Sequence, residues 1–302
     1  MNAYAEQAIT FDCQGSTLLG VMAAPHAGPA QADTAVLVVV GGPQYRVGSH
    51  RQFVQLARAV AASGYAVLRF DLRGMGDSQG QHAGFEAVSE DIGAAIGALQ
   101  AHVPQATRIV LFGLCDGASA ALLYMHDTRD ARVGALCLLN PWVRTPDSLA
   151  RTHVRHYYLK RLVSGEFWRK LFAGGVGQRA LTEFAGAVRH SARSAQPKPA
   201  ASAGGRRNVH FRDAMRSGCS AFPGPVLLAL SDDDLTAKEF ADVAASDATW
   251  RQLLARQSMQ KIQLQDADHT LSSPAAQSAF EVAMIRWLRA VSSIPTATCA
   301  RQ

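Results

Sequence analysis

The sequence predicts an α/β fold with a mostly parallel central sheet, helices on both faces and an inserted helical cap. Continuous apolar runs, typical of strands buried on both faces, alternate with stretches whose apolar residues recur at helical spacing. Such alternation favours a parallel sheet between two layers of helices. A basic segment interrupts the pattern once. The chain has 302 residues, of which 48% are hydrophobic, which allows a large core and excludes global disorder.

The elements follow from local patterns. Residues 6–13 and 17–23 predict two strands joined by a turn at Gly15-Ser16, an opening hairpin. Further strands are expected at residues 34–40, 65–71, 108–114, 133–140, 225–231 and 259–266, and the first three of these are expected to be buried. The helices expected between and after them are residues 50–63, 85–103, 115–126, 237–258 and 274–291. Gly64 is a typical stop for the first helix.

The charge distribution marks the cap. Residues 144–222 contain 15 Lys and Arg against 4 Asp and Glu, which leaves 15 of the 30 basic and 20 of the 24 acidic residues elsewhere. We therefore predict a cap at 144–222 between two core parts, 1–143 and 223–302, with a mobile Ser-, Ala-, Pro- and Gly-rich loop at 191–206. The basic cap would suit an anionic donor such as coenzyme A, but a solvated surface explains the charge equally well.

Several classes of protein and site are not expected. The five cysteines are unevenly spaced, which fits neither a disulfide framework nor a zinc site. No glycine fingerprint for a dinucleotide and no phosphate-binding loop is present, so we expect no cofactor and no metal. No nucleic-acid-binding motif accompanies the basic charge. No apolar run reaches the roughly 20 residues of a membrane span, and the N-terminus lacks a signal-peptide pattern. We expect a cytoplasmic protein.

The central motif is Gly113-Leu114-Cys115-Asp116-Gly117, which lies between a predicted strand and a predicted helix. The G-x-S-x-G form of this turn raises a nucleophile out of a sharp bend, and small flanking residues let the chain pass close to itself. Cys115 would then lie at a helix N-terminus, where a thiolate is favoured. Asp116 opposes the thiolate unless its side chain turns away. The alternative is that Cys115 is an inert core residue.

A catalytic triad in this arrangement follows the chain order nucleophile, acid, histidine. The acid is expected in Asp232-Asp233-Asp234, after the strand at 225–231. We prefer Asp234, with Asp233 second, because the loop turns back there. His269, after the last strand, would take and return the thiol proton, and the acid would orient it. The other nine histidines have no such placement.

The oxyanion hole is expected to combine the N–H of Asp116 with one from the loop after the strand at 34–40. Pro43 lacks an N–H, so Gly42 is the preferred donor and Gln44 the second choice. The loop Asp71-Leu72-Arg73-Gly74-Met75-Gly76-Asp77-Ser78 carries charged groups that we expect to bond to backbone, and we predict a structural role for it.

Together these residues resemble the α/β-hydrolase superfamily, and the resemblance implies an α/β-hydrolase fold over nearly all of the chain except about 144–222. More narrowly, GGPQYRVGSHRQF, DLRGMGDS, FGLCDGASA and SDDDLTAKEF look like the exosortase A system-associated hydrolase 1 family, which is found near exopolysaccharide synthesis and protein-sorting genes. Membership implies a triad of Cys115, Asp234 and His269. The chain departs from the common superfamily pattern in having Cys for Ser and no His before Gly41-Gly42.

Three functions remain open. The first is hydrolysis of an ester or thioester through an acyl-thioester on Cys115, similar to the cysteine triad of dienelactone hydrolases. The second is an acyltransferase that moves an acyl group from coenzyme A or a carrier to an alcohol or thiol, since polyhydroxyalkanoate synthases resemble this pattern too. The third is a non-catalytic binding module. The substrate is expected to be a small acyl ester or thioester, and no nucleic-acid partner is expected.

Overall fold

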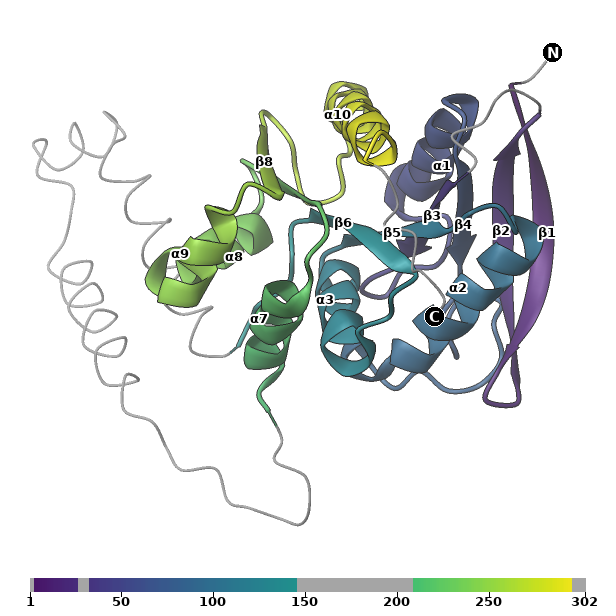
Figure 1. The fold of residues 1–302 in the computed structure, drawn as a ribbon, viewed down its shortest axis with the longest axis horizontal. Helices are drawn as coiled ribbons and strands as arrows, with labels where there is room; N and C mark the ends of the chain where they lie inside the picture. The colour runs from purple at the N-terminus through teal and green to yellow at the C-terminus, as the bar shows by residue number, and fades with distance from the viewer. Residues whose placement is uncertain (1–2, 27–32, 146–208, 295–302) are drawn as a thin grey trace, which may run out of the picture.

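The computed structural model describes residues 3–26, 33–145 and 209–294, and these form an eight-stranded sheet in the order β1-β2-β4-β3-β5-β6-β7-β8 (Figure 1). The β1–β2 hairpin and the β2–β4 pair are antiparallel, and all pairs from β4 to β8 are parallel. The strands are β1 (Tyr4–Cys13), β2 (Ser16–Pro25), β3 (Thr34–Val39), β4 (Ala66–Phe70), β5 (Arg108–Leu114), β6 (Val133–Leu139), β7 (Val226–Ser231) and β8 (Met259–Leu264). The predicted fold is confirmed.

Helices cover both faces of the sheet (Figure 1). One buried cluster joins the sheet to α1 and α10, and a second joins it to α2, α3, α7, α8 and α9. The helices are α1 (Gln52–Ala62), α2 (Ser89–His102), α3 (Asp116–Thr128), α7 (Phe211–Ala221), α8 (Leu235–Ser246), α9 (Ala248–Leu254) and α10 (Pro274–Ser292), with 3-10 turns η1 (Ser49–Arg51) and η2 (Phe85–Ala87). Strands β3, β4 and β5 are buried at every residue, as their continuous apolar runs predict.

One predicted helix is wrong in extent. Residues 237–258 form not one helical stretch but most of α8 and the separate helix α9, followed by a turn. The break lies at Asp247, whose backbone is extended and whose carboxylate accepts the N–H of Trp250 at 2.9 Å. An aspartate that can cap a new helix competes with continuation of the old one.

Helix α7 falls inside the range predicted as the cap. It packs tightly on α3, because a Cβ added to Gly218 would lie 2.1 Å from the carbonyl oxygen of Leu122. Arg212 at its start donates from Nε to the carbonyl oxygen of Val143 at 2.6 Å. The chain therefore returns to the sheet beside the point where it leaves it. The rest of the predicted cap, residues 146–208 with the loop at 191–206, lies outside the described residues.

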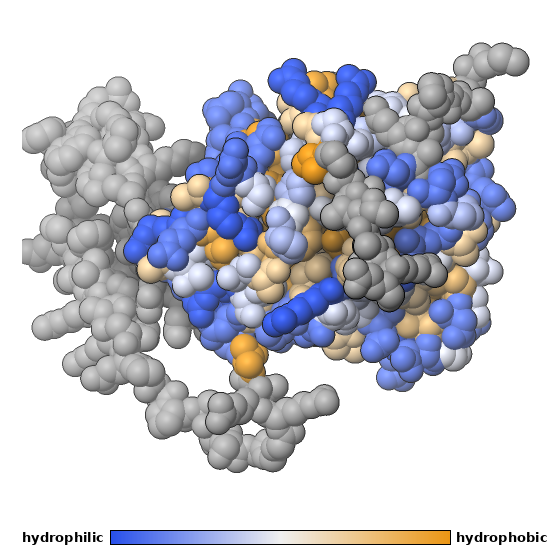
Figure 2. Space-filling view, viewed as in Figure 1, coloured by the Kyte–Doolittle hydropathy of each residue, from blue (hydrophilic) through white to orange (hydrophobic). Residues whose placement is uncertain are grey.

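The surface seen in Figure 2 is mostly hydrophilic, with scattered apolar areas. None of the described helices combines the length and the apolar character needed to cross a membrane.

A buried arginine closes the C-terminal end of α10: the Arg108 guanidinium donates to the carbonyl oxygens of Val291 and Ile294. Carbonyl oxygens in the last turn of a helix lack the donors that the helix interior provides, so Arg108 supplements the N–H of Ile294 at Val291 and ties α10 to the start of β5.

Candidate active site

Cys115 lies at a sharp turn between β5 and α3. Its backbone has φ 60° and ψ −125°, a conformation that residues with a side chain rarely adopt and that active sites often contain. The N–H of Cys115 donates to the carbonyl oxygen of Leu139 at 2.9 Å, and its own carbonyl oxygen accepts the N–H of Trp142 at 3.1 Å. Ser119 Oγ donates to the carbonyl oxygen of Trp142 at 2.7 Å. The turn is thus held from both sides.

The flanking glycines are required by crowding. A Cβ on Gly113 would lie 2.4 Å from the carbonyl carbon and oxygen of Gly117, and a Cβ on Gly117 would lie 2.4 Å from the carbonyl oxygen of Val39. Gly41 is equally confined, since its Cβ would approach the N–H nitrogen of Gly117 to 2.4 Å. The loop after β3 therefore passes directly against the start of α3. Gly42 in this loop and Asp116 at the start of α3 are the two predicted oxyanion donors.

Cys115 differs from the other cysteines that the structure describes. It is half-buried, whereas Cys13, Cys137 and Cys219 are buried. Burial raises the pKa of the Cys13 and Cys219 thiols to about 11 each and also raises that of Cys137. These three thiols remain protonated at neutral pH and are poor nucleophiles. Cys299 lies outside the described residues.

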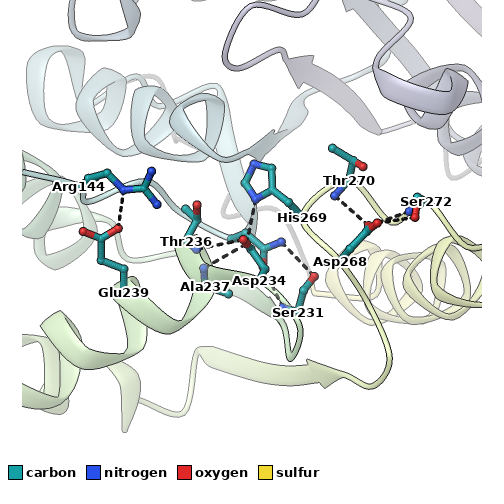
Figure 3. A network of polar contacts seen from close by, with 11 residues as sticks. Arg144, Ser231, Asp234, Thr236, Ala237, Glu239, Asp268, His269, Thr270 and Ser272 are labelled. Carbon is teal, nitrogen blue, oxygen red and sulfur yellow. Dashed lines mark hydrogen bonds and ion pairs between the residues drawn. The ribbon is translucent and has the colours of Figure 1, made fainter. Parts of the chain in front are cut away.

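Asp234 and His269 form a direct pair. His269 Nδ1 lies 2.9 Å from Asp234 Oδ2 (Figure 3). Asp234 is buried and caps α8, because its carboxylate accepts the N–H groups of Thr236 at 3.0 Å and Ala237 at 3.1 Å. With the acid fixed by two backbone donors, Nδ1 of the histidine points at it and Nε2 is left for another partner.

That other partner is Cys115. Burial lowers the pKa of His269, but hydrogen bonds to Asp234 and to the Cys115 side chain outweigh burial and raise the pKa to about 10. At neutral pH the imidazole therefore holds its proton between a carboxylate and a sulfur. A histidine oriented by a carboxylate beside a cysteine is the arrangement of a proton carrier next to a nucleophile.

Asp233, the second choice for the acid, takes another position. Its side chain is exposed, and its N–H donates to the carbonyl oxygen of Ala267 at 3.1 Å. Asp232 Oδ1 accepts the N–H of Ala267 at 3.2 Å. These two aspartates therefore join the loop after β7 to the loop after β8, while Asp234 alone of the three contacts His269 in the part of the chain that the structure describes.

Two further groups position the site and were missed by the sequence reasoning. Asp268 accepts the N–H of Thr270 at 3.2 Å and that of Ser272 at 2.8 Å, which fixes the His269 loop (Figure 3). Asn140, just after β6, donates from Nδ2 to Ser231 Oγ at 3.0 Å and accepts the N–H of Ser231 at 2.8 Å. The Asp-x-Thr-x-Ser pattern at 268–272 is a signal for the first group; nothing in the sequence signals the second.

The structural role predicted for residues 71–78 is confirmed. Asp71 is completely buried and accepts the N–H groups of Arg46 at 2.7 Å and Asp77 at 2.9 Å. The Arg46 guanidinium bridges Asp71 and Asp77. Arg46 belongs to the loop after β3, so this network fixes the loop that carries Gly42. Gln44, the second-choice donor, uses its side-chain oxygen within the same loop, to accept the Ser49 N–H at 3.1 Å.

At the edge of the described chain, Arg144 Nε donates to Glu239 Oε2 at 2.9 Å (Figure 3). The Arg144 guanidinium also lies 4.5 Å from the centre of the Trp142 ring. Within the described ranges, no group of three His, Cys, Asp or Glu side chains could hold a metal ion.

The pair predicts a pH dependence of stability. The pKa of His269 is about 10 in the folded protein against an ordinary value of 6.5. Its contribution to the free energy of unfolding is therefore complete below pH 6.5 and is lost as the pH rises towards 10. Urea unfolding of the wild type and of His269→Ala at several pH values measures this. The difference between the two proteins should shrink from pH 6.5 to 10, and a constant difference would contradict the prediction.

The comparisons with known proteins show the family and the fold. The family model described as serine aminopeptidase S33 matches residues 31–198, more than half of the chain. No curated protein is similar enough in sequence to be matched.

Solved structures extend the likeness to nearly the whole chain. An esterase from Pyrococcus furiosus is 14% identical, with a TM-score of 0.62 over 96% of this chain and 92% of its own. Est1E from Butyrivibrio proteoclasticus, solved with ferulic acid bound, is 16% identical, with a TM-score of 0.59 over 94% of this chain and 99% of its own. A dienelactone hydrolase from Anabaena variabilis is 15% identical, with a TM-score of 0.57 over 96% and 99%.

Proposed function

The chain belongs to the serine aminopeptidase S33 family of the α/β-hydrolase superfamily and is a hydrolase, and on this premise we propose that it cleaves an ester or thioester with Cys115 as the nucleophile. His269 is the proton carrier, Asp234 orients it, and the N–H groups of Gly42 and Asp116 form the oxyanion hole. The observation that carries the proposal is the Asp234–His269 pair, 2.9 Å apart, with the Cys115 side chain among the groups that raise the pKa of His269.

The proposed reaction has two halves. The Cys115 thiolate attacks the substrate carbonyl carbon, the carbonyl pair moves to the oxygen, and the oxyanion is stabilised by the two N–H groups. Collapse breaks the bond to the leaving group, which takes the proton of the His269 imidazolium, and an acyl-thioester remains. Water then gives a proton to His269 and adds to the thioester carbon. Collapse expels the thiolate and releases a carboxylic acid.

The cysteine in place of the family's serine shapes the substrate proposal. A thiolate is a good leaving group, so the tetrahedral intermediate expels Cys115 and returns to the intact substrate unless the substrate's leaving group departs as easily. Esters of acidic alcohols and thioesters satisfy this condition. The esterase and dienelactone hydrolase among the structural relatives are compatible with ester substrates.

Two exposed apolar side chains that lie near site residues in the sequence favour an apolar acyl group. Tyr45, in the loop that carries Gly42, and Leu235, which follows Asp234, are 43% and 42% exposed. Large apolar side chains at these positions would lower their exposure to water when an acyl chain binds. The narrower assignment, to the exosortase A system-associated hydrolase 1 family, rests on the four sequence motifs and links the substrate to exopolysaccharide or sorting systems.

The acyl-enzyme tests the proposal directly. Incubation with p-nitrophenyl butyrate followed by an acid quench should leave one butyryl group, found on the peptide that contains Cys115 by mass spectrometry. The adduct should disappear with time as butyric acid, and in ¹⁸O water that acid should carry the label. An acyl group found only on a serine or nowhere, while the ester is hydrolysed, would contradict a cysteine nucleophile.

The second candidate is acyl transfer, because a thioester intermediate keeps enough energy to acylate an alcohol or thiol. The excess positive charge of residues 144–222 favours an anionic donor such as coenzyme A. Butyryl-CoA offered with and without an acceptor alcohol separates the two reactions, since a transferase forms the ester in preference to the free acid. The KM for the CoA ester should also rise with salt, while the KM for a neutral ester should not.

A further inference from the structure

The side chain of Asp116 lies inside the site rather than in solvent. Asp116 is the first residue of α3 and follows the proposed nucleophile. A Cβ added to Gly41 would lie 2.2 Å from Asp116 Oδ1, and one added to Gly42 would lie 4.0 Å from it. The carboxyl has thus turned onto the loop after β3, the same loop that supplies the proposed donor Gly42.

The environment of this carboxyl is unusual for an acid. Burial raises its pKa, and the backbone N–H groups of Gly42, Asp116 and Gly117, which face the carboxyl, oppose this rise without cancelling it. Oδ1 is buried and has no hydrogen-bond partner of normal geometry. A buried polar oxygen without a partner destabilises the folded protein, so its position calls for an explanation other than stability.

The N–H groups that face the carboxyl explain it. Two of them, those of Gly42 and Asp116, are the donors of the proposed oxyanion hole, and a carboxylate oxygen has the charge and size of the oxyanion formed during acyl transfer. We propose that the Asp116 carboxyl occupies the oxyanion hole of the free protein and competes there with the substrate. This inference rests on the proposed function, because it needs a hole that serves Cys115.

As a consequence, the Asp116 carboxyl occupies the oxyanion hole until the substrate binds. The carbonyl oxygen must displace the Asp116 side chain before its developing charge can be stabilised. Removal of the carboxyl should therefore strengthen the binding of any ligand that forms an oxyanion on Cys115. It should change much less the reactions of the same sulfur that form no oxyanion.

Two probes of Cys115 separate these cases. With iodoacetamide, sulfur attacks the CH₂ carbon and iodide leaves, so no oxyanion forms. With a short alkyl trifluoromethyl ketone, sulfur adds to the carbonyl carbon, the carbonyl pair becomes an alkoxide, and nothing leaves. The ketone's dissociation constant is measured as protection of Cys115 from alkylation, followed by mass spectrometry, so the test needs no turnover.

We expect Asp116→Ala to bind the ketone roughly tenfold or more tightly than the wild type, after correction for any change in the alkylation rate. Asp116→Asn keeps the shape of the side chain but has a weaker acceptor oxygen, so its dissociation constant for the ketone should lie between those of the wild type and Asp116→Ala. Asp233→Ala removes an exposed carboxylate from the same edge of the sheet and should leave the ketone's affinity unchanged.

The two ways of failing are distinct. If both Asp116 variants bind the ketone no more tightly than the wild type, while alkylation of Cys115 is still faster in the wild type than in His269→Ala, the competitor role of Asp116 is wrong and the proposed function stands. If His269→Ala does not slow alkylation in the wild-type background, the proposed function fails, and the inference fails with it.

Discussion

Replacement of Cys115 by alanine is expected to lower kcat for p-nitrophenyl butyrate by about 10³-fold or more, because it removes the proposed nucleophile that forms the acyl intermediate. His269→Ala should cost about as much. The double variant should lose little beyond either single one, since residues that act as a unit are not additive. Initial rates provide the comparison, with the protein concentration measured by a method that does not depend on an intact active site.

A matched control exists within the chain. Cys219 is a buried cysteine on α7 with a protonated thiol, so Cys219→Ala should keep kcat within about threefold of the wild type, as a variant that touches no reacting group. Circular dichroism and the unfolding midpoint show whether each variant is folded. A folded Cys115→Ala protein that keeps about a tenth or more of kcat would exclude the thiol as nucleophile.

The second large effect is expected at Asp234. Asp234→Asn should lower kcat by about 10³-fold to 10⁴-fold, because an amide no longer holds the His269 tautomer or stabilises the imidazolium. Asparagine is as good a helix cap as aspartate, and its one amide oxygen can still accept one of the two N–H groups, of Thr236 and Ala237, that bond to separate oxygens of Asp234. The variant therefore tests the contact with His269, and its unfolding midpoint shows how much the start of α8 is affected.

Asp233→Asn provides the comparison for the second choice of acid. Its side chain is exposed, and its bond to Ala267 is made by the backbone N–H, which the substitution preserves. We expect kcat within about twofold of the wild type, as for other surface substitutions. A larger loss in Asp233→Asn than in Asp234→Asn would reverse the assignment of the acid.

The fold could be predicted from the sequence because its signals are local. Buried parallel strands have continuous apolar sequences. The carboxyl ends of such strands meet at one edge of the sheet. This rule is what brings Cys115, Asp234 and His269 into one region of the prediction. The break at Asp247 was missed because an aspartate caps a helix only where its own backbone is not helical, and the sequence pattern does not show that backbone conformation.

Other parts of the site depend on rotamers and on contacts between distant segments. The clamp between Asn140 and Ser231 joins the ends of two strands through side chains that carry no motif. The position of the Asp116 carboxyl depends on the close passage of Gly41. Periodicity and propensity describe neighbours along the chain, so they cannot locate such contacts across the fold.

The backbone at Cys115 has a consequence for the evolution of this protein. A left-handed φ on a residue with a side chain costs of order 1–3 kcal/mol, and the packing of the two helical layers must offset this in every folded copy. Position 115 is therefore one where thermal resistance and reactivity oppose each other. A glycine there would relieve the strain and remove the sulfur, so selection for heat tolerance alone would drive the chain away from its chemistry.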